Sequence, residues 1–346
     1  MSDKVEILSK DYQRYAPAGS GMGGRRIIKA AALLITLGYC SLLVYQGGVN
    51  YNVQESRSVQ VADLPIEPVT KTSILDSGQS KNITLDDIFI SVKTTKFYQY
   101  SRLPIILKTW FQLAKKQTWF FTDTDNPRHQ NQTNGHMVNT KCSASHQLKH
   151  LCCKMSVEYD HFLESGKKWF CHFDDDNYVN VPRLLAVLQK YNHQEDWYLG
   201  KTSVNKPVDM FKKPTNQLLY TFWFATGGAG ICLSRSLALK MLPIASGGRF
   251  ISICESIRFP DDVTLGYIIE HLMEKNLTRL PELHSHLEQM KLLNPETFRD
   301  QISFSYSKTS KGWNVINVPG FNYRYDPTRF LSLHCYLFPY FKYCPR

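Results

Sequence analysis

The chain has 346 residues, of which 41 are Lys or Arg and 30 are Asp or Glu, so its formal charge is +11. Hydrophobic residues make up 43% and aromatic residues 13%, a composition that excludes a disordered polyelectrolyte. No long block of like charges, zinc-finger pattern or leucine zipper occurs. We therefore expect no nucleic-acid partner and relate the basic bias to an anionic ligand.

The N-terminal segment is predicted to be a membrane anchor. Residues 1–26 are polar and end in Arg25-Arg26, whereas residues 27–46 are mainly apolar, with Lys29 their one charge. A membrane span needs roughly 20 apolar residues, and Lys29 can extend to the membrane surface. The flanking cations place residues 1–26 in the cytoplasm and the bulk of the chain on the lumenal side. The alternatives are a buried core helix and a cleaved signal peptide, although the long polar tail and the lack of a small-x-small cleavage site disfavour the peptide.

Residues 47–85 lack sustained periodicity and are rich in Ser, Gly, Asn, Pro and charged residues, which is typical of a linker. We expect a lumenal stem here, followed by a single α/β domain at 86–346.

Apolar segments with strand and helix spacing alternate from residue 86 onward. This alternation predicts a mostly parallel sheet with helices on both faces. In chain order we expect a strand at 88–92, a helix at 97–113 despite Pro104, strands at 118–121 and 136–138, a helix at 154–163, a strand at 169–173 and a helix at 182–188; apolar segments at 197–200 and 222–234 and helices at 236–242 and 262–273 complete the pattern.

Eight of the nine cysteines follow the predicted anchor, and Cys40 lies within it. Lumenal proteins meet an oxidising environment, so the spacing of these cysteines indicates possible disulfides. It permits Cys335 with Cys344, Cys142 with Cys152 or Cys153, and Cys171 with Cys232. A zinc site is the alternative, but the chain has no CxxC pair. Glycosylation sequons at Asn82, Asn131 and Asn276 agree with the same compartment.

The most informative chemistry is the run Asp174-Asp175-Asp176, which directly follows the apolar segment WFCHF. Ligands of open α/β sheets bind beyond the carboxyl ends of the strands. Three carboxylates there repel one another unless a cation lies among them, and hard divalent ions prefer carboxylate and phosphate oxygens. The run predicts a metal that binds a nucleotide-sugar diphosphate. The alternative is an acidic turn that caps the next helix.

Two further segments could complete such a site. In Pro260-Asp261-Asp262, a carboxylate opens a predicted helix, where it is either a cap or the base that transfer to a hydroxyl requires. In His284-Ser285-His286, alternate residues of an extended chain face the same side, so either imidazole could reach a metal while the other is structural. The glycines at 227–230 could bind phosphate but are also common in turns.

These motifs resemble the Fringe family. The resemblance rests on the segments IFISVKTTKFYQYSRL (88–103), WFCHFDDDNYVN (169–180), FWFATGGAGICLSR (222–235), FPDDVTLGYIIE (259–270), HSHLE (284–288) and the C-terminal DPTRFLSLHCYLFPYFKYCP. It runs from about residue 86 to the end, so it spans the predicted domain and leaves out the tail, anchor and stem.

The resemblance implies an α/β GT-A glycosyltransferase fold, a Rossmann-like mixed sheet flanked by helices and preceded by one transmembrane helix. It also implies a single-pass type II protein of the Golgi membrane with a lumenal catalytic domain. Fringe enzymes use Mn²⁺, with Mg²⁺ as the less suitable ion. They transfer N-acetylglucosamine from UDP-GlcNAc, in β-1,3 linkage, to O-linked fucose on EGF-like repeats of Notch receptors and their ligands, and so modulate Notch signalling.

Matching the motifs assigns roles to individual residues. By resemblance, Asp176 and His286 would bind the metal, Arg102 and Asp175 would bind the donor, and Asp262 would be the catalytic base. The same resemblance implies three disulfides, Cys142–Cys153, Cys171–Cys232 and Cys335–Cys344. It assigns no partner to Cys152 or Cys254.

Two other functions remain open at this stage. A related β-1,3-galactosyltransferase would share the fold and the acidic run while using another donor or acceptor. A catalytically silent glycan-binding protein would keep the scaffold, but we expect such a protein to have lost at least one of the catalytic motifs.

Overall fold

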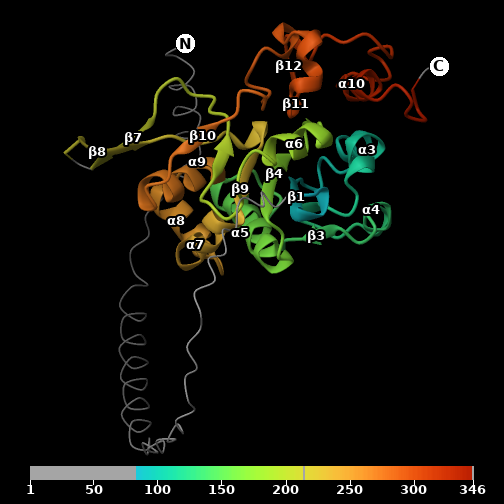
Figure 1. Cartoon of the computed structure of the whole chain (residues 1–346). Coiled ribbons are helices and arrows are strands. Elements are labelled where there is room, and N and C mark those ends of the chain that lie inside the picture. The colour runs from blue at the N-terminus through green and yellow to red at the C-terminus, as the bar shows by residue number, and fades with distance from the viewer. Residues whose placement is uncertain (1–82, 213–214, 345–346) are drawn as a thin grey trace, which may run out of the picture. The chain divides into compact units, whose positions relative to one another are not determined.

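The computed structural model describes residues 83–212 and 215–344 (Figure 1). The predicted tail at 1–26, the anchor at 27–46 and nearly all of the stem at 47–85 lie outside these residues, as does Asn82. Among the described residues no single helix is long and apolar enough to cross a membrane. Helices α7 (Arg235–Ala245) and α8 (Arg249–Ile257) reach the required length and composition only together, and they are bent by 72°.

The predicted parallel-dominated sheet is confirmed. Seven strands lie in the order β10-β6-β9-β4-β1-β2-β3, and every neighbouring pair is parallel except those made by β9. The strands are β1 (Ile88–Lys93), β2 (Thr118–Thr122), β3 (Met137–Asn139), β4 (Trp169–Asp174), β6 (Tyr198–Gly200), β9 (Ile231–Ser234) and β10 (Leu277–Arg279).

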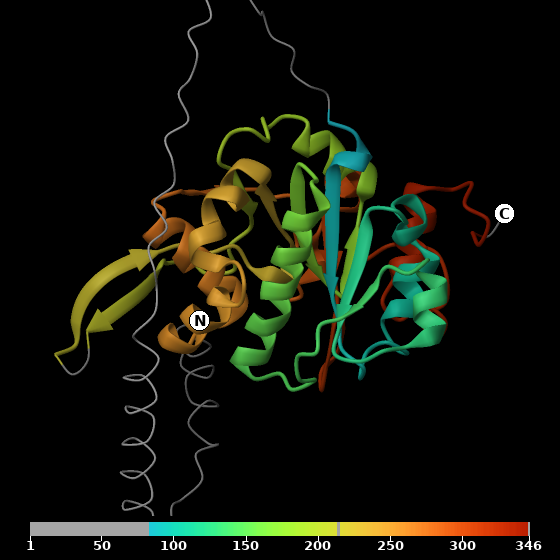
Figure 2. The ribbon, with the colours of Figure 1, turned by 90° about the horizontal axis from the view of Figure 1, so that it is seen from below.

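Helices cover both faces of the sheet, because successive strand residues point to opposite sides. In β1, Ile88, Ile90 and Val92 join one buried cluster, together with side chains from α3 (Leu103–Lys108), α6 (Val181–Leu188) and α10 (Phe330–Leu337). Phe89 joins a second cluster, with side chains from α5 (Leu148–Ser165), α7 and α8. Figure 2 shows α5 lying along one face of the sheet.

The predicted helix at 97–113 is wrong at its start. Residues 96–102 form turns, α3 begins at Leu103, and a short 3-10 helix follows at Trp110–Leu113. Pro104 explains the shift, because proline is tolerated in the first turn of a helix but not in its interior. The predicted helix at 154–163 extends further, as α5, and ends at Gly166, which adopts a left-handed conformation with φ of 69°.

Several elements have no counterpart in the predicted pattern. They are helices α4 (Pro127–Gln132) and α8, strand β10, the strand pair β5 (Asn177–Val179) and β11 (Ser303–Ser305), the hairpin β7 (Val208–Lys212) with β8 (Gln217–Phe222), the hairpin β12 (Ser307–Thr309) with β13 (Gly312–Asn314), and α10. The predicted helix at 262–273 is divided into α9 (Asp261–Gly266) and a π-helix at Tyr267–Leu272.

Four disulfides join the described residues. Three of them, Cys142–Cys153, Cys171–Cys232 and Cys335–Cys344, are the pairs implied by the family resemblance. The fourth joins Cys152 on α5 to Cys254 on α8, two cysteines to which the resemblance assigned no partner; the alternative pairing of Cys142 with Cys152, which the spacing also permitted, is wrong. Cys171 and Cys232 face each other directly across β4 and β9.

The Cys152–Cys254 disulfide is expected to contribute most to stability, because it closes a loop of 102 residues. A cross-link stabilises mainly by restricting the unfolded chain, and longer loops gain more. Replacing both residues by Ala should lower the free energy of unfolding by about 2–5 kcal/mol, measured by denaturant titration without reductant. The matched control is the double Ala variant of Cys335 and Cys344, which are 9 residues apart and should cost less. Equal losses in the two variants would contradict the loop-length argument.

Candidate active site

Segments that are far apart in sequence meet at one edge of the sheet. Strands β1, β4, β6 and β10 run in the same direction, so their carboxyl ends lie at this edge, where β4 ends in Asp174. Because β9 is antiparallel to β4, it starts at the same edge, and the 3-10 turn Gly227–Ala229 precedes it. The topology thus brings the acidic run, the glycine turn and the segment after β10 together.

Asp175 is held by the segment that follows β1. Its carboxylate accepts a hydrogen bond of 2.8 Å from Thr94 Oγ1 and another of 2.6 Å from Arg102 Nη1. The Arg102 guanidinium lies over the ring of Tyr98, 3.7 Å from its centroid. Burial raises the pKa of Asp175, and Arg102 and Thr94 oppose that rise. Arg102 therefore fixes and partly neutralises the second carboxylate of the run.

Two basic side chains, Lys93 and His172, lie beside Asp174. Lys93 Nζ lies 3.3 Å from Asp174 Oδ1 and His172 Nε2 lies 3.6 Å from it. Lys93 also bonds Asp261 Oδ2, at 2.7 Å. Although burial would lower the pKa of Lys93, Asp174 and Asp261 raise it well above its ordinary value. A buried ammonium therefore joins the first residue of the acidic run to the first carboxylate of α9.

Asp176 and His286 come together, as the resemblance implies for two metal ligands. Asp176 Oδ2 lies 3.5 Å from His286 Nδ1, and that buried nitrogen has no hydrogen-bond partner. Burial lowers the pKa of His286, so its imidazole is neutral near pH 7. Burial and the neighbouring Asp174 raise the pKa of Asp176 to about 8. This carboxylate has less cationic compensation than its neighbours.

The donor set fits a divalent cation bound partly by the protein. A carboxylate oxygen and a neutral imidazole nitrogen are both suitable ligands for Mn²⁺. Across the part of the chain that the structure describes, no group of three or more His, Cys, Asp and Glu side chains is arranged to hold a metal ion. Asp176 and His286 would therefore leave ligand positions for phosphate oxygens and water, as is usual for hard cations at phosphate sites.

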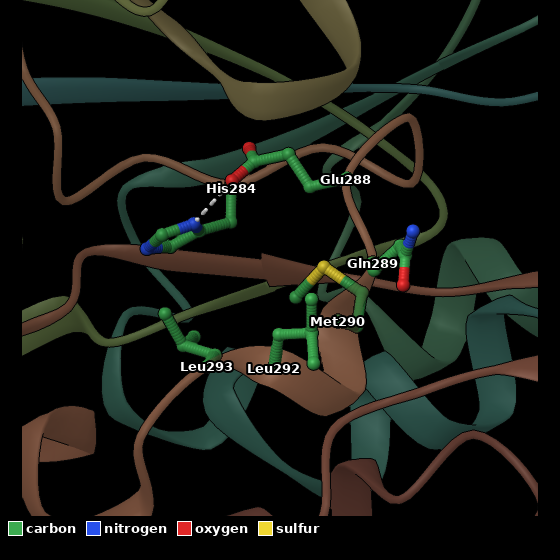
Figure 3. Close-up of a pocket in the computed structure, with 6 residues that line it drawn as sticks. All are labelled: His284, Glu288, Gln289, Met290, Leu292 and Leu293. Carbon is green, nitrogen blue, oxygen red and sulfur yellow. Dashed lines mark hydrogen bonds and ion pairs between the residues drawn. The ribbon is translucent and has the colours of Figure 1, made fainter.

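His284 is the structural member of the HSH segment. One ring nitrogen lies 3.0 Å from Glu288 Oε2 (Figure 3). The other lies 2.9 Å from Gln301 Oε1, so both nitrogens are engaged. Hydrogen bonds from His284 and Lys201 outweigh burial and lower the pKa of Glu288 to about 2. A hollow of about 250 Å³ borders His284, and the residues that line it are His284, Glu288, Gln289, Met290, Leu292 and Leu293. None of the three aspartates at 174–176 reaches this hollow.

Asp262 lies beside the glycine turn, next to Gly227. It lies in the first turn of α9, where its Oδ2 accepts the N–H of Gly227 at 3.1 Å and its Oδ1 that of Val263 at 2.8 Å. Burial and the adjacent Asp261 raise the pKa of Asp262 to about 6. Lys93 bonds Asp261 directly, whereas Asp262 has only backbone donors among its hydrogen bonds. A carboxylate in this state is suited to accept a proton near neutral pH.

The glycine turn leaves room between these groups. A methyl group on Gly228 would lie 3.5 Å from His286 Cε1 and 3.6 Å from Asp174 Oδ2. A methyl group on Gly227 would lie 3.5 Å from Asp262 Cβ and 3.7 Å from His172 Nε2. Asp174 and His286 therefore lie beside Gly228, and Asp262 lies beside Gly227, so all three border the same short turn.

A buried polar network behind the site was missed by the sequence interpretation. His172 Nδ1 and Ser91 Oγ both lie 2.6 Å from Glu158 Oε2, and none of the three residues is exposed to solvent. Burial lowers the pKa of His172, but Glu158 outweighs this effect and the pKa rises to about 9. The available signals were a histidine inside the apolar segment WFCHF and a glutamate between Met155 and Phe162 on the buried side of α5.

The two described sequons lie at the surface. The side chain of Asn131 is exposed at the end of α4, and that of Asn276 is exposed just before β10. Their glycosylation stays a prediction.

Comparison with known proteins identifies the family. The profile of the family described as "Fringe-like" matches residues 83–341. The chain belongs to the Fringe-like family. Its relatives include a protein named Fringe glycosyltransferase from Drosophila melanogaster, 59% identical over 81% of this chain and 69% of the relative.

Two vertebrate relatives carry more specific names. A beta-1,3-N-acetylglucosaminyltransferase lunatic fringe from Danio rerio is 46% identical over 84% of this Fringe-family chain and 78% of its own. A beta-1,3-N-acetylglucosaminyltransferase radical fringe from Gallus gallus is 48% identical over 78% and 73%. A solved glycosyltransferase involved in glycosylation of the major capsid of PBCV-1 aligns over 64% of this chain and 95% of its own, at 11% identity and a TM-score of 0.35, too low to support an argument.

Whether the donor occupies the space beside Gly228 can be tested directly. The Gly228→Ala variant should fold normally, because the added methyl meets only ordinary van der Waals contacts, yet it should lower donor affinity on the order of tenfold by filling the space beside His286. Donor binding would be measured by calorimetry and stability by thermal melting.

The matched control is Gly230→Ala. Gly230 has a φ of 109°, and a methyl there would lie 2.4 Å from Phe173 Cε1. This variant should lose stability through backbone strain and overpacking. Normal donor affinity in a stable Gly228→Ala protein would show that the donor does not occupy this space.

Proposed function

We propose that this Fringe-family chain is an inverting glycosyltransferase that moves N-acetylglucosamine from UDP-GlcNAc to the 3-hydroxyl of O-linked fucose on EGF-like repeats, in β-1,3 linkage. The observation that carries the proposal is the convergence of the acidic run, His286 and Asp262 around the Gly227–Gly228 turn. The names of the Danio and Gallus relatives, both beta-1,3-N-acetylglucosaminyltransferases, support the donor sugar and the linkage.

The donor diphosphate would lie at the acidic end of the site. Asp176 and His286 would hold Mn²⁺, which when bound offsets the negative charge that develops on the departing UDP. Arg102 and Thr94 already fix the Asp175 carboxylate. Its oxygens can still accept further hydrogen bonds, which would orient the ribose or the uracil of the donor. The guanidinium of Arg102 is also suited to contact phosphate oxygens.

The acceptor would approach from the side of Asp262. As the acceptor 3-hydroxyl oxygen bonds to the anomeric carbon, the bond from that carbon to the diphosphate breaks, and its electron pair leaves with UDP. Asp262 Oδ2 takes the hydroxyl proton, and the Gly227 N–H orients this carboxylate. Because the nucleophile enters opposite the leaving group, an α-linked donor gives a β-linked product.

The cellular setting is part of the same proposal. The disulfides among the described residues support an oxidising compartment. The compartment we propose is the Golgi lumen, with residues 27–46 as a single-pass type II membrane anchor. The proposed partners are O-fucosylated EGF-like repeats of Notch receptors and their ligands, and the proposed consequence is a change in Notch signalling.

A transfer assay tests the donor, the acceptor and the metal together. The full-length chain should transfer N-acetylglucosamine from UDP-GlcNAc to an O-fucosylated EGF-like repeat, and chelation should abolish the transfer until Mn²⁺ is restored. A donor panel with UDP-galactose separates the galactosyltransferase alternative. Binding of the repeat without release of UDP would favour the silent glycan-binding alternative and contradict this proposal.

The base is tested by Asp262→Asn. Transfer should fall about 10²–10⁴-fold, because the amide can still accept the Gly227 N–H but cannot take a proton. In the wild type, kcat/KM should rise with pH through an apparent pKa near 6 and then level off, because burial and Asp261 raise the Asp262 pKa to about 6 and only the ionised form is a base.

The control for this test is Asp125→Asn, which alters a carboxylate that is 77% exposed and should leave the rate unchanged. UDP binding should be retained in both variants. Near-normal transfer by the Asp262→Asn protein would mean that another group removes the proton.

A further inference from the structure

The hairpin formed by β7 and β8 projects away from the rest of the described fold (Figures 1 and 2). Its strands pair with each other and belong to no larger sheet of the described chain. The sequence pattern did not predict it, and the proposed reaction gives it no role.

The outer half of this hairpin carries three exposed apolar side chains. Phe211, Leu218 and Leu219 are 46%, 51% and 53% exposed. Phe211 and Leu218 face each other across the strands, and Leu219 is the extra residue at the register shift. We call these three residues the hairpin patch. Single exposed apolar residues are ordinary, but adjacent ones on a free hairpin are typical of an interaction surface.

The inner half of the hairpin is firmly held. The ring of Tyr220 stacks on His271 with centroids 3.5 Å apart, and Phe222 packs edge-on against Tyr267. Just beyond β8, the N–H of Trp223 donates to Glu270 Oε2 at 2.6 Å. An isolated two-stranded hairpin is only marginally stable, so these contacts to the π-helix explain why it keeps its shape.

The same contacts connect the patch to the active site. The π-helix continues directly from α9, which carries Asp262, and the chain from β8 leads to Gly227, whose N–H bonds that carboxylate. Gly227 is nine positions after Leu218 in the chain. An extended chain of that length spans at most about 30 Å, so the two residues are no farther apart than this. This is about the diameter of a small domain.

We propose that the hairpin patch is a docking surface for the polypeptide that carries the acceptor sugar. The inference rests on the proposed function, because a site that accepts a sugar on a protein must recognise the protein outside the sugar pocket. Lys212 is exposed on this hairpin and Lys206 is exposed just before it, with the exposed Asp209 between them, so the matching partner surface has an apolar centre with acidic residues opposite the two lysines. The rigid connection to α9 favours this occupant over a second copy of the chain or a lipid bilayer, since neither needs a link to the base.

The test compares two acceptors. The triple variant Phe211→Ser, Leu218→Ser, Leu219→Ser of the full-length chain would be assayed with UDP-GlcNAc and either an O-fucosylated EGF-like repeat or a small α-fucoside. KM for the repeat should rise about tenfold or more, because exposed aromatic and aliphatic anchors dominate such interfaces. The kinetic constants for the α-fucoside and the KM for the donor should not change.

Two control variants make the result specific. Leu239→Ser with Leu242→Ser removes apolar residues of similar exposure, 43% and 37%, from α7 and should behave like the wild type. Replacing Phe211, Leu218 and Leu219 all by Met keeps the hairpin patch apolar and should restore the KM for the repeat.

Other outcomes would overturn the proposal. These are an unchanged KM for the repeat, an equal loss with both acceptors, or a Ser variant that loses only vesicle binding or self-association. Binding of the repeat measured without donor separates this proposal from the proposed function. If the wild type transfers to neither acceptor, the proposed function is wrong. If the wild type nevertheless binds the repeat and the Ser variant does not, the docking surface is still supported.

Discussion

The arrangement of the site depends on how buried carboxylates at one edge of the sheet are compensated. Burying an ionised carboxylate is costly unless a cation or several hydrogen bonds accompany it. Lys93 forms ion pairs with Asp174 and Asp261, and Arg102 forms one with Asp175. Asp176 and Asp262 receive much less, with a more distant Arg102 for the first and two backbone N–H groups for the second. The two carboxylates with the least compensation are therefore Asp176 and Asp262. The family resemblance assigns the first as a metal ligand and the second as the catalytic base.

Strand β9, which is antiparallel to both of its neighbours in the seven-stranded sheet, brings the glycine turn to these carboxylates. Because β9 runs against β4 and β6, it begins where they end, and its leading turn of glycines reaches the acidic edge. A methyl group on Gly227 would be in van der Waals contact with Asp262, and one on Gly228 would be in contact with His286 and Asp174. The disulfide Cys171–Cys232 links the same two strands directly, so it fixes the register on which this placement depends.

Local sequence predicted the features that local rules control. Short apolar runs located β1, β2 and β4, and the resemblance supplied the residues that the structure brings together around the glycine turn. The Glu158–His172 pair, the Cys152–Cys254 disulfide and the β7–β8 hairpin were not predicted. Each depends on segments that meet only in the folded chain, or, for the hairpin, on anchoring to the π-helix. Periodicity carries no information on such contacts.

The position of Asp262 shows how a long-range contact places one side chain of a short helix. A methyl group on Gly266 would lie 2.4 Å from Phe224 Cβ and 2.8 Å from the Trp223 carbonyl oxygen, so only glycine permits this approach of α9 to the segment after β8. The close approach brings Asp262, one helical turn earlier, within hydrogen-bond distance of Gly227. The helix changes to π geometry immediately afterwards, an irregularity that is frequent at functional sites. The carboxylate proposed as the base is therefore placed by the packing of Gly266 as much as by its own helix, and the Pro-Asp-Asp motif alone did not distinguish this placement from that of a helix cap.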